Sequence, residues 1–201
     1  MTSGKKLSVN TKKIKAIMAG IAVLLCFLML AGCSSMNEAE NKVSKELKAL
    51  QSSGSTGSEV IALRDSLSDE GRENFDGFLK KLRSFEFEIT GSEEDDDKDD
   101  DYTLVSVRIK TFDFGREYLA AWTEYLKANE DTTQEDLTDF YELLFARLNS
   151  LEEKDCIKHI SIVCIDPLDN GEWIANIKDN EELQDAIFGG MLSEMKALAA
   201  E

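Results

Sequence analysis

The side chains best suited to nucleophilic chemistry in this 201-residue sequence are two cysteines and a histidine that lie close together. Cys156, His159 and Cys164 fall within the stretch 155–165, whose apolar pattern predicts a β-strand. Alternation along a strand places both cysteines on the face opposite His159, which argues against a cysteine–histidine nucleophile. His159 is the only histidine, so a metal site with several histidine ligands is excluded. We expect a structural or partly exposed histidine.

The same strand bears on disulfide formation. If it is continuous, the Cα atoms of Cys156 and Cys164 are about 26 Å apart, whereas a disulfide needs less than about 7 Å. We therefore expect two buried free thiols, which suits an anaerobe or a habitat without strong oxidants. A bridge to another chain, or one made possible by a bent strand, is the alternative.

An acidic tract from Glu93 to Asp101 offers many carboxylates to a cation. It lacks the EF-hand pattern, which needs a glycine at the sixth position and a late glutamate. Since so many like charges repel one another and stay hydrated, we predict a solvated loop over residues 92–101, with weak cation binding as the alternative. No Gly-rich phosphate loop, Gly-x-Ser-x-Gly turn or metalloprotease His-Glu pair occurs. We predict no catalytic residue, metal site or cofactor.

The first 33 residues have the pattern of an export signal. Five lysines and no acidic residue precede an apolar run, Ile17–Leu30, which is followed by small residues and Cys33. The run is shorter than the roughly 20 residues that span a bilayer. The tetrapeptide Leu30-Ala-Gly-Cys33 resembles the lipobox of bacterial lipoproteins, which implies lipid on Cys33 and cleavage before it. We predict a signal peptide over 1–32, a lipidated tether over 33–36 and a lipid anchor on the extracytoplasmic face of the cell membrane; an uncleaved membrane anchor is the alternative.

The net charge of the chain disfavours two classes of binding partner. The chain has a net charge of −17, and cleavage would leave 18 basic and 40 acidic residues, a net charge of −22. Nucleic acid is disfavoured, because its phosphates require neutralising Lys and Arg. Adhesion to anionic lipid is disfavoured for the same reason, so we expect membrane contact through the acyl chains alone.

Periodicity predicts an α+β fold in a single domain over residues 37–201. Amphipathic helices and strands of period two alternate along it. An antiparallel sheet of about four strands with helices packed on one face buries all the apolar faces. A glycine pair, Gly189-Gly190, marks a kink or a close backbone contact in the last helix. The expected strands are 85–90, 103–111, 156–165 and 172–177; the expected helices are 38–51, a region around 60–67, one capped by Ser68, 114–129, one opened by a Thr132/Glu135 capping box, and one capped by Asp179 or Asn180.

One predicted helix carries an aromatic stripe. Phe114, Tyr118, Trp122 and Tyr125 follow one another at helical spacing. They could line a cavity between sheet and helices, where the polar edges of Tyr and Trp would orient a ligand. Packing in the hydrophobic core is the competing interpretation.

Four stretches together resemble small extracytoplasmic lipoproteins of Gram-positive anaerobes with an NTF2-like (cystatin-like) domain. The long helical pair 114–151 and the helix after the last strand depart from the simplest plan of that family, so the resemblance implies a variant with extra helices. Such domains host enzymes, ligand pockets and interaction modules, so the fold alone leaves function open. The four stretches are the lipobox ending at Cys33, Phe85–Gly91, Val105–Phe114, and Gly171–Asn176 with Glu182–Gly190.

These observations favour a membrane-tethered, non-catalytic module that binds a protein partner or a small ligand. An enzyme that uses a carboxylate in an NTF2-like pocket is one alternative. The other is a structural envelope protein that associates with itself as a homo-oligomer.

Overall fold

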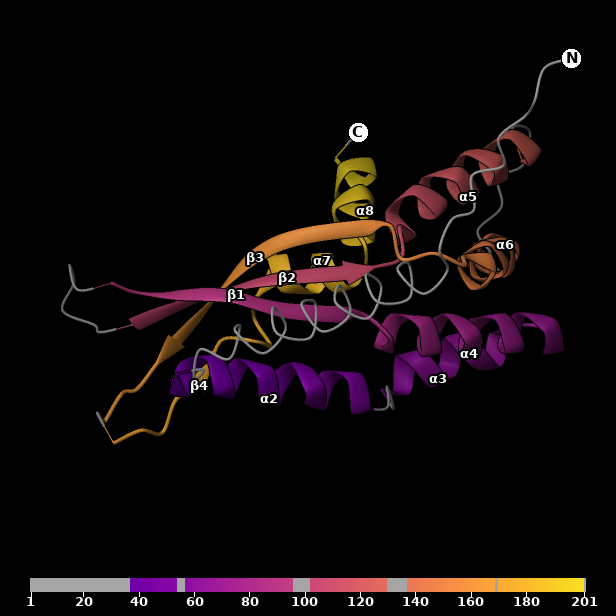
Figure 1. Ribbon diagram of the computed structural model, residues 1–201. Coiled ribbons are helices and arrows are strands. Elements are labelled where there is room, and N and C mark those ends of the chain that lie inside the picture. Colours follow the sequence, from indigo (N-terminus) through magenta and orange to yellow (C-terminus); the bar gives the residue numbers. More distant parts are fainter. Residues whose placement is uncertain (1–36, 54–56, 96–101, 130–136, 169, 201) are drawn as a thin grey trace, which may run out of the picture. The chain divides into compact units, whose positions relative to one another are not determined.

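A four-stranded antiparallel sheet forms the centre of the computed structural model, which describes residues 37–53, 57–95, 102–129, 137–168 and 170–200 (Figure 1). Neighbouring strands follow one another along the chain, and Glu38–Glu201 form one compact unit. The predicted α+β class and the antiparallel four-stranded sheet are confirmed. The strands, in their order across the sheet, are β1 (Glu86–Asp95), β2 (Tyr102–Thr111), β3 (Cys156–Ile165) and β4 (Ile174–Ala175).

Strand β2 buries every second residue along its length, and β3 does so from Ile160 to Cys164, as the alternating pattern predicts. On β2, Val105, Val107 and Ile109 are buried, whereas Arg108 and Lys110 are exposed. The sheet therefore has one apolar face and one open face.

Two helices cover the apolar face. They are α2 (Glu38–Ser52) and α7 (Glu181–Ile187), and their buried side chains join those of the strands in one core. Burial is complete at Val43 and Leu47 of α2 and nearly so at Leu183 of α7. The prediction that helices pack on one face of the sheet holds for these two.

The other five helices build a second core, which the sequence patterns do not predict. Phe75, Phe78, Phe114, Phe140 and Phe145 are at most 5% exposed within it. In Figure 1 most of these helices lie beyond the end of the sheet where β1 begins and β2 ends, because α4 leads into β1, α5 leaves β2 and α6 leads into β3. The five helices are α3 (Ser58–Ser66), α4 (Asp69–Arg83), α5 (Phe114–Ala128), α6 (Thr138–Ser150) and α8 (Met191–Ala199).

The prediction of an acidic loop over residues 92–101 places its start too early, because residues 92–95 belong to β1. A bulge at Gly91 shifts the register of β1, and the strand then continues as Ser92–Asp95, paired with Tyr102–Val105. The backbone of this segment thus pairs with β2, while the side chains of Glu93 and Glu94 are exposed. Residues 96–101 lie outside the described residues.

Predicted helix caps are present where the structure describes them. The hydroxyl of Ser68 accepts a hydrogen bond from the Gly71 amide at 3.0 Å, and the Asn180 side chain accepts one from the Leu183 amide at 2.8 Å. The capping box expected at Thr132 and Glu135 lies outside the described residues.

The last helix is two helices rather than one. Gly189 (φ 55°) and Gly190 (φ 83°) are left-handed and end α7 before α8 begins. The Gly115 amide donates a hydrogen bond to the Gly189 carbonyl at 3.1 Å, and a Cβ on Gly189 would lie 2.0 Å from the Phe112 carbonyl oxygen. The predicted kink and the predicted close contact therefore both occur.

The fourth strand is much shorter than the predicted 172–177. Only Ile174 and Ala175 pair with β3, and the Asn176 amide makes one more bond to the Val163 carbonyl at 2.9 Å. Ile177 then turns its side chain into the core, where it is 6% exposed, and so the chain leaves the sheet. In the turn that precedes β4, Gly171 has a positive φ of 81°.

Among the described residues, no helix is both long and apolar enough to cross a membrane.

Candidate binding groove

Two adjoining cavities form a groove on the side of the molecule where β4 ends. The first has a volume of about 570 Å³ and the second about 370 Å³. Both are lined by Leu50 of α2, by Ser53 just after that helix, and by Ile177 and Lys178 after β4, so they form one continuous feature, which we call the groove. Its size is in the range of small-molecule sites.

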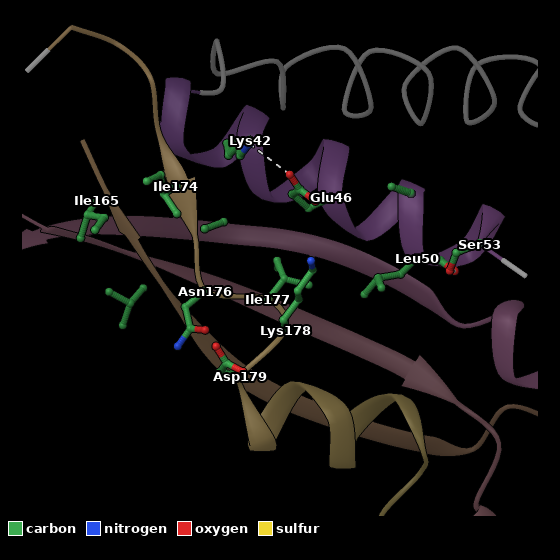
Figure 2. Close-up of a pocket in the computed structure, with 13 residues that line it drawn as sticks. Lys42, Glu46, Leu50, Ser53, Ile165, Ile174, Asn176, Ile177, Lys178 and Asp179 are labelled. Carbon is green, nitrogen blue, oxygen red and sulfur yellow. Dashed lines mark hydrogen bonds and ion pairs between the residues drawn. The ribbon is translucent and has the colours of Figure 1, made fainter. Parts of the chain in front are cut away.

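The short fourth strand is the reason the groove exists. Because β4 stops after two residues, the segment Asn176–Asp179 leaves the sheet and faces α2 across the first cavity, as Figure 2 shows. Two small side chains, Ala49 and Ala175, keep the space between helix and segment open. The second cavity continues between α4 and α7, where Leu79, Leu82, Phe85, Leu183, Ile187 and Phe188 line it.

The lining is apolar and the rim is charged. Lys42 and Glu46 form an ion pair at 3.1 Å on the α2 side, visible as a dashed line in Figure 2. Lys178 and Arg83 also reach the groove, and neither makes an ion pair with any described residue.

No reactive group is built into this groove. Within the described part of the chain, the buried polar side chains are Thr103 and Thr111, so no carboxylate there is withdrawn from water. Glu46 and Asp179 line the first cavity but keep exposed surface. A carboxylate that acts as a general acid at neutral pH needs a desolvated setting that raises its pKa.

The cysteines and the histidine occupy opposite faces of β3, as predicted. Ile160, Ile162 and Cys164 are buried on the apolar face, whereas His159 is exposed on the open face. Both Cys156 and Cys164 are free thiols, but Cys156 is half-buried rather than buried. Burial raises the pKa of the Cys164 thiol to about 11 and also raises the pKa of Cys156. Neither thiol is therefore activated as a nucleophile.

The predicted pocket residues lie in the second core. Phe114 is fully buried, and its ring centroid is 5.3 Å from that of Phe78. Tyr118, Trp122 and Tyr125 surround the ring of Phe140 at centroid distances of 5.9, 5.2 and 5.6 Å. None of the four lines the groove. In the described structure their contacts are those of core packing, and burial raises the pKa of Tyr118.

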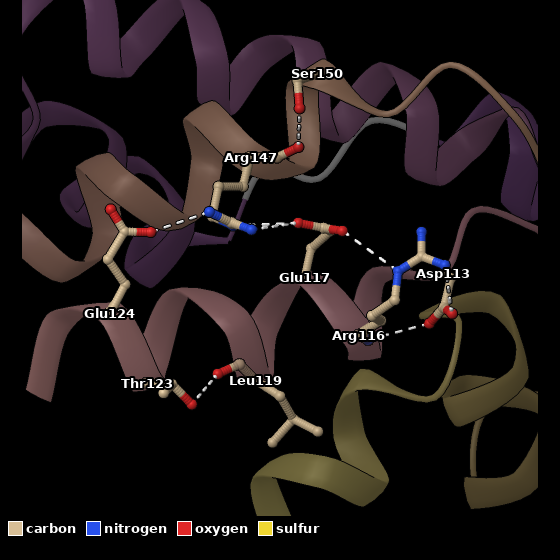
Figure 3. Close-up of polar contacts among 8 residues, drawn as sticks. All are labelled: Asp113, Arg116, Glu117, Leu119, Thr123, Glu124, Arg147 and Ser150. Carbon is tan, nitrogen blue, oxygen red and sulfur yellow. Dashed lines mark hydrogen bonds and ion pairs between the residues drawn. The ribbon is translucent and has the colours of Figure 1, made fainter. Parts of the chain in front are cut away.

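A charged network beside this aromatic cluster is structural. Arg147 of α6 binds Glu117 at 3.1 Å and Glu124 at 3.0 Å, both on α5 (Figure 3). Glu117 also accepts a bond from Arg116 at 3.4 Å, and Arg116 reaches Asp155 before β3 at 3.4 Å. The network joins α5 to α6 and to the start of β3. It borders no cavity of the groove.

Metal binding finds no support in the described residues, where no three His, Cys, Asp or Glu side chains gather to hold an ion. Most of the acidic tract lies outside them, so weak cation binding there stays a prediction. Cys33, the predicted lipidation site, also lies outside the described residues.

In comparisons with protein-family models, curated proteins and solved structures, nothing matches this chain. The relationship to NTF2-like proteins therefore stays a prediction.

Sequence reasoning did not find the groove. Its residues come from α2, α4, the ends of β3 and β4, the segment after β4 and α7, and each is an ordinary apolar, polar or charged residue in its own element.

Proposed function

We propose that this protein is a lipid-tethered, extracytoplasmic binding module without catalytic activity, and that the groove holds an apolar ligand. The observation that carries the proposal is the groove itself, an apolar channel of ligand size whose lining contains no buried carboxylate, activated thiol or histidine among the described residues.

The lipid tether rests on the sequence. A basic start, an apolar run of 14 residues and Leu30-Ala-Gly-Cys33 agree in length, charge and position. Residues Ser34–Asn37 then separate Cys33 from α2. Such a chain stays attached to the outer surface of the membrane while its folded part faces the medium.

The rim suggests the class of ligand. Lys178 and Arg83 can each bind an anionic group at the edge of an apolar channel, because no described carboxylate neutralises them. The ligand that suits both features is an amphipathic acid with an apolar body that fills the groove.

The alternative enzyme has less support. It requires a carboxylate held away from water, where the pKa is raised. In the carboxylates whose pKa departs clearly from the ordinary value, a basic partner at the surface lowers the pKa instead. Arg64 lowers that of Asp76, Lys154 that of Glu86 and Lys196 that of Glu181. None of these residues lines the two cavities.

Fluorescence titration with 1-anilinonaphthalene-8-sulfonate, a probe with an apolar body and an anionic group, tests the groove. We expect saturable binding to the chain from Cys33 onward, and loss of at least roughly tenfold in affinity in Ala49→Trp, because the indole fills the first cavity. Lys178→Gln should weaken binding less, since only the charge is removed.

The matched control is Ala128→Trp, at the exposed C-terminal end of α5. It adds the same side chain away from the groove and should leave the titration unchanged. Equal binding by Ala49→Trp and the parent chain would show that the probe binds elsewhere.

A further inference from the structure

The turn between β3 and β4 exposes apolar side chains that no core accounts for. Leu168 is 73% exposed and Ile174 53%, the two highest values among large apolar residues in the described ranges. Ile165, at the end of β3, is 37% exposed and is paired with Ile174 on the open side of the sheet. A soluble module gains nothing from such a cluster unless another surface covers it.

This turn lies beside the first turn of α2. The indole Nε1 of Trp173 donates a hydrogen bond to the Glu38 carboxylate at 3.3 Å. A Cβ on Gly171 would lie 3.2 Å from the same carboxylate. Figure 1 shows the connection between β3 and β4 next to the start of α2. The exposed cluster is therefore held at the point where the described chain begins.

The length of chain before α2 fixes how far this point can be from the lipid. Five residue steps separate Cys33 from Glu38, and a fully extended chain covers at most about 3.6 Å per residue, or about 18 Å in all. A lipid on Cys33 would therefore keep the turn within reach of the headgroup layer.

We infer that Leu168, Trp173 and Ile174, which we call the apolar turn, contact the lipid surface to which Cys33 is anchored. The inference rests on the proposed lipid anchor. Trp173 is half-buried and packs in part against the core of the sheet. A tryptophan at a membrane favours the boundary between headgroups and acyl chains, where its N–H stays hydrated or bonded. Leu168 and Ile174 add apolar side chains on either side of it.

The charges around the apolar turn are mixed. Glu38 and Glu172 border it and are exposed, Lys42 and Lys45 of α2 line the same surface hollow, and exposed glutamates near the end of β1 lie at the same end of the sheet. The glutamates repel anionic headgroups over roughly a Debye length, about 8 Å at physiological salt, and the two lysines offset part of that repulsion. The contact therefore adds to the acyl anchor through apolar burial, in keeping with the acidity of the chain.

The groove opens next to this surface. Ile174 of the apolar turn and Ile165, its partner on β3, also line the first cavity. The proposed contact with lipid therefore lies beside the groove, which gives an amphipathic acid a short path between bilayer and groove.

The two tryptophans of the chain supply a test, because Trp173 lies in the apolar turn and Trp122 lies on α5 in the second core. The lipidated protein is reconstituted into phosphatidylcholine vesicles with brominated acyl chains, which quench tryptophan on contact. In Trp122→Phe, where Trp173 is the only reporter, we expect loss of emission relative to unbrominated vesicles. In Trp173→Phe, the Trp122 emission should be unchanged.

A second pair of variants controls for the apolar contact. Leu168→Ser should reduce the quenching of Trp173, whereas Leu126→Ser, at a 48% exposed leucine on α5, should leave it unchanged. Replacing a third of the lipid with phosphatidylglycerol should weaken quenching at low salt. Equal emission of Trp173 in brominated and unbrominated vesicles overturns the inference.

Failure of the anchor is recognised separately. The mass of the N-terminal peptide shows whether Cys33 carries lipid. If it does not, the same variants are held on nickel-chelating lipid through a histidine tag joined before Asn37, and the quenching is measured again. This experiment tests contact between the apolar turn and lipid even where the native anchor is absent.

Discussion

At the scale of single residues, burial explains why the most reactive side chains of this sequence are inert. Cys164 is fully buried on the apolar face of the sheet, and its thiol donates only a long hydrogen bond, 3.9 Å, to the Ile162 carbonyl. Desolvation disfavours the thiolate and raises the pKa of Cys164 from 9.0 to about 11. Cys156, at the other end of β3, keeps some exposed surface.

This difference predicts the order of thiol modification. At pH 8, Cys156 should react with iodoacetamide well before Cys164, and both should react at similar rates in guanidinium chloride. Peptide mass spectrometry after timed quenching measures the two rates. Faster modification of Cys164 in the folded chain would contradict the burial of this side chain.

The raised pKa of Cys164 also links stability to pH. The folded state holds the thiol proton more tightly than the unfolded state, whose pKa is about 9. The resulting contribution to the free energy of unfolding is fully present below pH 9 and is lost as the pH rises toward 11. In Cys164→Ala, the free energy of unfolding measured in urea should fall less between pH 9 and pH 11 than in the parent chain. An equal fall in both chains would argue against this link.

At the scale of elements, the sequence predicts the features that depend on neighbouring residues alone, such as strand alternation and helix caps. The alternation of Val105, Val107 and Ile109 gives β2 its buried face, and Ser68 and Asn180 cap the helices that follow them. The length of β4 depends instead on a tertiary contact, the packing of Ile177 into the core. The second core escapes prediction for the same reason, since an amphipathic helix shows that it has a partner but not which one.

The break between α7 and α8 is an element-scale feature that a single substitution tests. Gly189→Ala should destabilise the protein by about 3 kcal/mol, because it combines a left-handed backbone with a Cβ against the Phe112 carbonyl. Urea denaturation monitored by circular dichroism measures the change.

Gly57 provides the control for this substitution. It precedes α3 with an ordinary φ of −61°, and a Cβ there meets only Val60 at 3.9 Å. Gly57→Ala should cost less than about 1 kcal/mol. Similar losses in the two variants would mean that Gly189 is not held by its contact with the end of β2.

At the scale of the whole molecule, the groove and the proposed tether differ in how much of each the sequence reveals. The groove lies between α2, α4, α7 and the segment after β4, and α2 begins five residues after Cys33. The sequence alone predicts the tether, because export signals are local and linear. It does not predict the groove, because Leu50, Leu82 and Ile187 become neighbours only after folding. The aromatic stripe, in contrast, is visible in the sequence but packs into the second core.

Native mass spectrometry of the protein extracted from membranes in mild detergent tests the central claim most directly. We predict a monomer that begins at Cys33, carries diacylglyceryl lipid there, and releases a discrete small-molecule adduct on activation. The adduct should be absent from Ala49→Trp, in which the groove is filled, and present in Ala128→Trp. A chain that retains residues 1–32 without lipid, and that carries no adduct in either form, would contradict the account of a tethered binding module.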